Sequence, residues 1–212
     1  MAQPQRLTGP HLQTVLGDVV AALAIYQNRR DLSDLLATKL KGPGYGDLSL
    51  TREQQEVFED SMNAHSLISL AYAGYVHSWE RYRRVFNLDP TAYAEGSTIF
   101  GLAQYGGPGG RAQFELDYPE AIVDVWNNSN AVYWFANTIR NALAHGSYYF
   151  TTWSVKVTLY NVHPQTGRKT FDVSFPAAVF ARLILRSLQS FVRNVGPVGG
   201  HAPLSQMLEY LQ

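Results

Sequence analysis

Residues 132–160, VYWFANTIRNALAHGSYYFTTWSVKVTLY, contain the change of pattern that decides the fold. Up to Ala144 the apolar residues recur at steps of three and four, which is the spacing of a helix with one buried face. Gly146 is the residue type that commonly ends a helix. From Trp153 onward apolar and polar residues alternate, as in a strand with one buried face. The stretch therefore predicts a helix, a stop at Gly146 and a strand.

The residues that follow complete a hairpin and add another helix. Residues 170–175 alternate again between apolar and polar types, and residues 163–167 have the composition of a turn. We therefore expect a β-hairpin within 149–175. An apolar pattern with helical spacing begins at Pro176, a residue that suits the first position of a helix. A glycine-rich tail over 196–212 follows this last long helix.

Upstream, the sequence predicts helices separated by breaks rich in glycine and proline. Helical spacing of apolar residues runs over 11–41 and again over 51–87. We interpret the glycine-rich segment 96–118 as a flexible surface loop, and we expect the next helix to span 119–144. No internal repeat or linker divides the chain. The prediction is one mainly α-helical domain over 1–212.

The composition narrows the possible chemistry. A chain of 212 residues with 46% apolar and 13% aromatic residues is expected to fold. Seventeen Lys and Arg balance seventeen Asp and Glu, so no overall field attracts nucleic acid or anionic membrane, and any RNA contact has to be local. The absence of cysteine excludes disulfides, thiolate nucleophiles and cysteine-bound zinc. No apolar run approaches the roughly 20 residues of a membrane span, and we expect a cytoplasmic protein.

Arg140, Asn141 and His145 bring a permanent cation, an amide and an imidazole together at the end of the predicted helix. At about 100° per residue, Asn141 and His145 share a helix face, whereas Arg140 lies about 140° from His145. Arg140 and His145 converge only if the last turn opens or if a symmetric second copy supplies one of them. These residue types suit metal-free RNA cleavage, because an imidazole transfers protons near neutral pH and a guanidinium stabilises phosphate charge.

The order of an arginine, a polar residue, three further positions and a histidine resembles the signature of the HEPN superfamily of ribonucleases and RNA-binding domains. Residues 139–146 are similar to the form found in stand-alone bacterial HEPN proteins. The hairpin and the helix after it resemble a plasmid- and defence-associated branch. The resemblance implies a helical bundle with a β-hairpin inserted between the motif helix and the last long helix. It also implies a homodimer in which the two motifs meet.

The resemblance implies a metal-independent endoribonuclease that needs no cofactor, with Arg140, Asn141 and His145 as its catalytic residues. Such proteins often serve as toxins or as abortive-infection effectors. The implied partners are a second copy, RNA and an antitoxin or other defence protein, with no membrane partner. HEPN toxins that pair with a nucleotidyltransferase antitoxin usually carry a tyrosine two residues after the histidine. That position is Ser147 in this chain, and Tyr148 follows one place later.

Other residues are candidates for contact with RNA. Arg81, Arg83 and Arg84 form a basic cluster among aromatic residues at the end of the second predicted helix, and Tyr148 is placed to stack on a base. Glu80 is a candidate acidic helper that nothing in the sequence places at the motif. Two alternatives stay open. One is a non-catalytic HEPN-like dimer that binds RNA or protein, and the other is a structural protein whose motif caps a helix.

Overall fold

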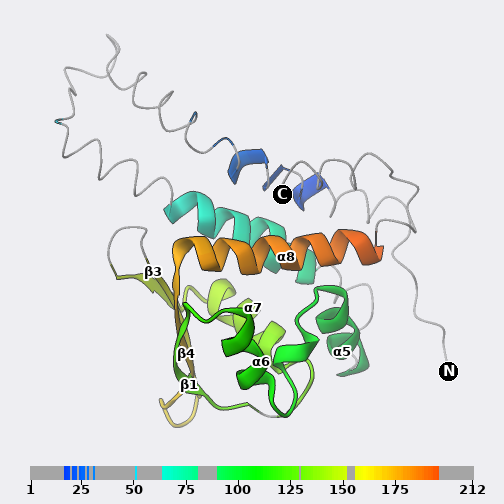
Figure 1. Cartoon of the computed structure of the whole chain (residues 1–212), viewed down its shortest axis with the longest axis vertical. Helices are drawn as coiled ribbons and strands as arrows, with labels where there is room; N and C mark the ends of the chain where they lie inside the picture. The colour runs from blue at the N-terminus through cyan, green and yellow to red at the C-terminus, as the bar shows by residue number, and fades with distance from the viewer. Residues whose placement is uncertain are drawn as a thin grey trace.

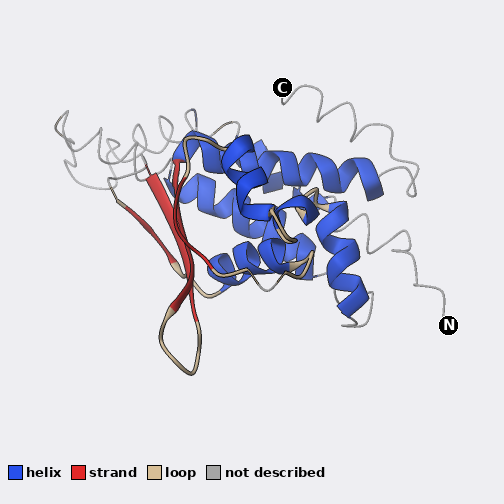
Figure 2. Ribbon diagram, turned by 60° about the horizontal axis from the view of Figure 1, so that its bottom comes forward, coloured by secondary structure: helices blue, strands red, loops and turns tan. Residues whose placement is uncertain are grey.

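The computed structural model describes residues 17–19, 21–22, 24–26, 28, 31, 51, 64–80, 90–128, 130–151 and 156–195. Within these residues, helices lie against one face of a small antiparallel sheet (Figures 1 and 2). Most of the helix predicted over 11–41 and all of the tail predicted over 196–212 lie outside them.

Helices make up most of the described chain, as the sequence predicts. Residues 64–80 are helical, in agreement with the helix predicted over 51–87. The centre of this helix, η1 (Leu70–Val76), is π-helical. Residues 17–19, 21–22, 24–26 and 31 are also helical, in agreement with the helix predicted over 11–41. Further helical elements are α5 (Pro90–Ile99), the 3-10 turn η2 (Ala103–Tyr105), α6 (Gly110–Asp117), α7 (Trp134–Ala144) and α8 (Ala177–Val195). α8 begins directly after Pro176, close to its predicted start.

Four antiparallel strands form the sheet in the order β1-β4-β3-β2. They are β1 (Ile122–Trp126), β2 (Tyr148–Phe150), β3 (Lys156–Val162) and β4 (Lys169–Pro176). β3 and β4 pair with each other and lie between α7 and α8 in the chain. Phe171, Val173 and Phe175 of β4 are completely buried, which confirms the alternation predicted for that strand. Their side chains face the helices and join the core.

The helix predicted over 119–144 is wrong in its first part, where the chain forms β1. β1 pairs with β4, and a bulge interrupts the register between Val123 and Val125. A bulge inserts one residue into a strand, so Val123 and Trp126, three positions apart, both pack against the core. Apolar residues three apart imitate the helical period. The sheet consequently extends beyond a hairpin, and α7 begins only at Trp134.

Segment 96–118 is not the flexible surface loop that the sequence suggests. It contains the end of α5, η2 and α6, and it supplies part of the core. Phe114 of α6 is completely buried. Its ring packs against the rings of Tyr105, Tyr118, Trp126, Phe135 and Phe175. The glycines of this segment separate short helices, and the aromatic residues between them hold the segment in place.

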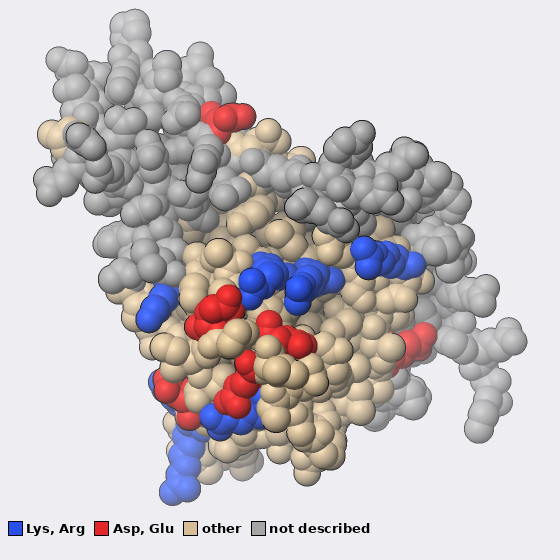
Figure 3. Space-filling view, in the orientation of Figure 1, with Lys and Arg blue, Asp and Glu red and all other residues tan. Residues whose placement is uncertain are grey.

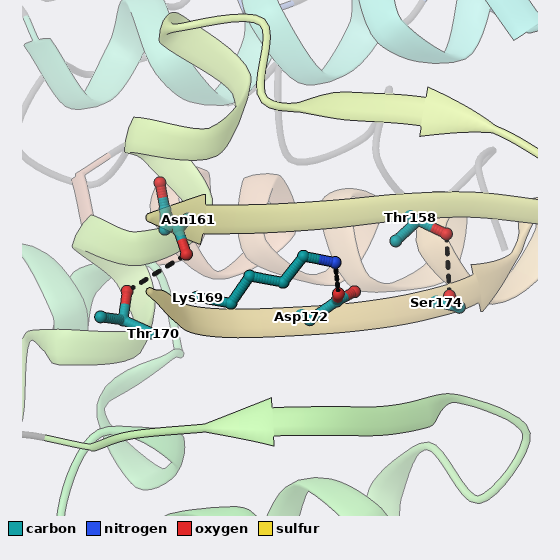
Figure 4. A network of polar contacts seen from close by, with 6 residues as sticks. All are labelled: Thr158, Asn161, Lys169, Thr170, Asp172 and Ser174. Carbon is teal, nitrogen blue, oxygen red and sulfur yellow. Dashed lines mark hydrogen bonds and ion pairs between the residues drawn. The ribbon is translucent and has the colours of Figure 1, made fainter. Parts of the chain in front are cut away.

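Polar contacts link residues across and along the strands of the sheet (Figure 4), and a further contact joins the sheet to α7. Across β3 and β4, the hydroxyls of Thr158 and Ser174 are 2.8 Å apart. Along β4, Lys169 forms an ion pair with Asp172. On the helix side, Asn161 of β3 donates its side-chain amide to the carbonyl oxygen of Thr138 in α7 over 2.8 Å. This last bond fixes the sheet against the middle of the helix that carries the motif.

Charge is divided into separate patches on one face of the molecule, although the net charge is zero. Lys and Arg side chains form a row along α8, with Asp and Glu side chains beside it (Figure 3). α8 contributes Arg182, Arg186 and Arg193 and has no acidic residue. Arg182 forms an ion pair with Glu120 over 3.1 Å. Within the described ranges, none of the helices combines the length and hydropathy needed to cross a bilayer.

Candidate functional site

α7 carries the three motif residues, and its end follows from its sequence. Gly146 adopts a φ of +65°, in the left-handed region that glycine enters without a steric penalty. The backbone N–H of Ser147 donates to the carbonyl of Ala142 over 2.7 Å, and that of Gly146 donates to the carbonyl of Leu143 over 3.3 Å. These two bonds form a Schellman motif. The helix end predicted at Gly146 is confirmed.

Arg140 is held by contacts on both ends of its guanidinium fork. Its Nη2 forms an ion pair with Glu80, which lies at the end of the helix over 64–80. Its Nη1 donates to Oδ1 of Asn141 over 2.6 Å. The side chains of Arg140 and Glu80 are only 17% and 23% exposed. The structure thus brings Glu80 to the motif, a contact that the sequence suggested but did not place.

The hydrogen bond from Arg140 sets the orientation of the side-chain amide of Asn141. A guanidinium only donates hydrogen bonds, so the atom that accepts from Nη1 is the amide oxygen. The amide nitrogen of Asn141 therefore lies on the other side and has two N–H groups to donate. Asn141 is half-buried. Its amide is oriented as a donor by a neighbouring cation.

His145 lies where α7 ends, and its side chain is exposed. Its backbone N–H still donates to the carbonyl of Asn141 over 3.0 Å, so the helical ladder continues to this residue. Helical geometry then keeps Arg140 and His145 about 140° apart around the axis. Among the described residues, the imidazole has no hydrogen-bond or ion-pair partner.

Tyr75 joins the helix over 64–80 to α7 beneath the site. Its hydroxyl donates to the carbonyl oxygen of Ala136 over 2.8 Å. Tyr75 is completely buried, and this burial raises the pKa of its hydroxyl well above the ordinary value of 10.0, with the charge of Arg140 opposing the shift. The neutral form of Tyr75 is therefore strongly favoured in the folded state.

Of the other residues predicted to contact RNA, the structure describes only Tyr148. Arg81, Arg83 and Arg84 lie outside the described residues. Tyr148 packs against the core, and its ring lies near that of Phe150, with 6.3 Å between the centroids. Its role in binding RNA stays a prediction. The described residues contain no group of three His, Asp or Glu placed to hold a metal ion, and the prediction that the reaction needs none is also untested.

A family model described as HEPN pEK499 p136 matches residues 47–197. The chain belongs to this HEPN family. The match confirms the resemblance suggested by the motif, and it includes Glu80 as well as the residues from Arg140 to His145. Comparison with curated proteins and with solved structures gives no match.

Sequence reasoning missed the role of Tyr75 beneath the candidate site, and it named Glu80 only as an acidic helper without a place. Both residues lie on a helix far from the motif in the chain, and neither has a spacing that points to α7. The ion pair of Glu80 with Arg140 and the bond from Tyr75 to Ala136 come from tertiary packing.

Proposed function

We propose that this HEPN protein is a metal-independent endoribonuclease that works as a homodimer. The observation that carries the proposal is the combination, at the end of α7, of a fixed guanidinium with an exposed imidazole. Arg140 is held by Glu80 and Asn141, and His145 lies at the surface. Arg140, Asn141 and His145 are the proposed catalytic residues.

The proposed reaction uses the neighbouring 2′-hydroxyl of RNA as its nucleophile. One imidazole removes the proton of this hydroxyl, and the oxygen forms a bond to the adjacent phosphorus. The bond from phosphorus to the 5′-oxygen breaks, and the leaving oxygen takes a proton from an imidazolium. The products are a 2′,3′-cyclic phosphate and a free 5′-hydroxyl. N–H groups of Arg140 and Asn141 stabilise the charge that develops on the phosphate oxygens.

The separation of Arg140 and His145 around α7 supports a site that is shared between two copies of the chain. The backbone N–H of His145 still bonds to the carbonyl of Asn141 in the helical pattern, so an opened last turn does not bring Arg140 and His145 to one side of the helix. A twofold dimer presents the same patch from both subunits, and the imidazole of one chain can then approach the guanidinium of the other.

Incubation of the purified protein with RNA in chelator tests this proposal. His145→Ala is the cleanest variant, because the side chain is exposed and its loss leaves no buried partner. His163→Ala is its matched control, since His163 is also exposed and lies in the turn between β3 and β4. We expect cleavage with cyclic phosphate ends for the parent and His163→Ala, and none for His145→Ala. Equal cleavage by all three proteins would refute the assignment.

Homodimer formation is tested separately by sedimentation equilibrium. We expect twice the chain mass for the parent, and we expect mixtures of inactive Arg140→Lys and His145→Ala chains to regain part of the activity. Each heterodimer would contain one intact half-site if the two motifs contribute to one another. A monomer that cleaves RNA would remove the dimer from the proposal and leave the nuclease.

The main alternative is a non-catalytic dimer that binds RNA or protein. The ion pair with Glu80 favours it, because this carboxylate neutralises Arg140 and both side chains are mostly buried. RNA binding that is equal in the parent and His145→Ala, without any product, would support this alternative. A toxin or defence role is tested by expression in bacteria, where the nuclease predicts growth arrest that His145→Ala relieves.

A further inference from the structure

The ion pair between Glu80 and Arg140 joins two elements that are separate in the chain. Glu80 lies in the last turn of the described helix over 64–80, and Arg140 lies in α7. With exposures of 23% and 17%, the two groups are largely withdrawn from water. Withdrawing charges from water costs free energy, and such pairs are weak evidence for stability. We therefore look for the contribution of this ion pair in the orientation that it gives to the side chain of Arg140.

The shape of arginine makes this geometry directional. The guanidinium is planar and presents its donors in a rigid fork. When Glu80 fixes Nη2, the plane of the fork is set, and Nη1 is directed at Oδ1 of Asn141. The N–H groups of the asparagine amide are thereby turned toward the other side. A lysine at position 140 carries the same charge but cannot make both contacts in one plane.

The helix that carries Glu80 is fixed against α7 by a second contact. The hydroxyl of Tyr75 donates to the carbonyl of Ala136, and Ala136 lies one α-helical turn before Arg140. Tyr75 belongs to the π-helical segment η1. A π-helical turn is wider than an α-helical turn and is frequently found at functional sites. The widened turn shifts the angular position of every residue after it, including Glu80.

We propose that Glu80 is a positioning residue, which holds the guanidinium of Arg140 so that Asn141 presents its amide N–H groups to a phosphate of RNA. This inference rests on the proposed function, because it assigns a task within the same site. Glu80 itself does not touch the substrate. Its carboxylate orients Arg140, and Arg140 orients the amide.

Glu80→Ala and Glu80→Gln separate positioning from charge. The glutamine keeps an oxygen that accepts from Nη2, whereas the alanine removes the contact. We expect kcat to fall about 100-fold in Glu80→Ala, the scale of a displaced catalytic group, with KM changed less than threefold. Glu80→Gln is expected to keep kcat within about threefold of the parent. Glu115→Ala is the matched control, because it breaks the exposed ion pair with Arg111 and leaves kcat unchanged.

Coupling with Asn141 tests the order of contacts. If Glu80 acts through the amide, Asn141→Ala and the double variant with Glu80→Ala lose the same kcat, because residues that act as a unit are not additive. Multiplicative losses in the double variant would overturn the inference. So would a Glu80→Gln protein as impaired as Glu80→Ala.

A readout without catalysis distinguishes failure of this inference from failure of the nuclease proposal. In NMR spectra, the side-chain amide of Asn141 is expected to shift in Glu80→Ala and to stay in place in Glu115→Ala. In a protein that cleaves no RNA, this shift still supports the positioning of Asn141, and the nuclease proposal alone fails. Unchanged amide signals in a folded Glu80→Ala protein would overturn the inference, whatever the activity.

Discussion

Replacing Gly146 with alanine tests the geometry that ends α7 and presents His145. Gly146 has a φ of +65°, and its N–H makes one of the two bonds of the Schellman motif. A Cβ built at this position meets no atom within 4 Å. The substitution therefore introduces no clash with neighbouring residues, and its cost is the backbone conformation alone.

The expected loss of unfolding free energy in Gly146→Ala follows from this backbone conformation. An L-residue in the left-handed region is disfavoured by roughly 1–2 kcal/mol. Alanine also restricts the unfolded chain, which returns about 0.4–1 kcal/mol. We expect Gly146→Ala to lower the free energy of unfolding by about 1 kcal/mol, which corresponds to a Tm lower by roughly 2–4 °C in a chain of this size.

Gly167 provides a matched control in the turn between β3 and β4. It has the same φ of +65° and equally open surroundings, so Gly167→Ala is expected to cost a similar free energy in urea unfolding. Only Gly146→Ala is expected to reduce RNA cleavage, because only that turn directs His145. A Gly146→Ala protein as stable as the parent would refute the assigned backbone conformation. Equal loss of cleavage in both variants would refute the local effect on His145.

Three further substitutions probe the packing around the site by urea unfolding. Phe114→Ala is expected to lower the unfolding free energy by about 3–5 kcal/mol, because the ring is completely buried in the aromatic cluster; a loss under 1 kcal/mol would mean that segment 96–118 is not core. Tyr75→Phe removes the bond to Ala136 and is expected to cost about 1 kcal/mol at pH 7. Because burial raises the pKa of Tyr75, its stabilising contribution is complete below the ordinary pKa of 10.0 and falls as pH rises above it, so the parent and Tyr75→Phe are expected to converge there. Asn161→Ala removes the bond from β3 to the carbonyl of Thr138 and is expected to cost about 1–2 kcal/mol, whereas an unchanged midpoint would show that this bond does not hold the sheet to α7.

The parts of the fold that the sequence predicts are those in which one local rule acts. The alternation in residues 170–175 indicates β4, because every second side chain enters the core. The end of α7 is predictable because a left-handed residue is needed there and Gly146 supplies it. In both places the pattern and the structure depend on residues a few positions apart.

The errors arise where two rules conflict. In β1 the bulge between Val123 and Val125 shifts the core-facing positions from a step of two to a step of three, and the sequence then has the period of a helix. In segment 96–118 glycine suggests mobility, but Phe114 and its neighbours are buried. The number of glycines measures backbone freedom. It does not measure how much apolar surface the segment buries, and burial determines whether it is ordered.

The candidate site shows the same difference between what a local pattern predicts and what tertiary packing determines. Arg140, Asn141 and His145 can be selected from the sequence because they lie within one and a half turns of a single helix. The environment of each comes from tertiary packing. Arg140 lies on a part of α7 that packs against the helix over 64–80, and it therefore meets Glu80 and is withdrawn from water. His145 lies at the point where α7 ends, and it stays exposed. A fixed cation and an exposed imidazole therefore follow from where α7 ends, which explains how one short motif can contain both a positioned group and a group that is open to solvent.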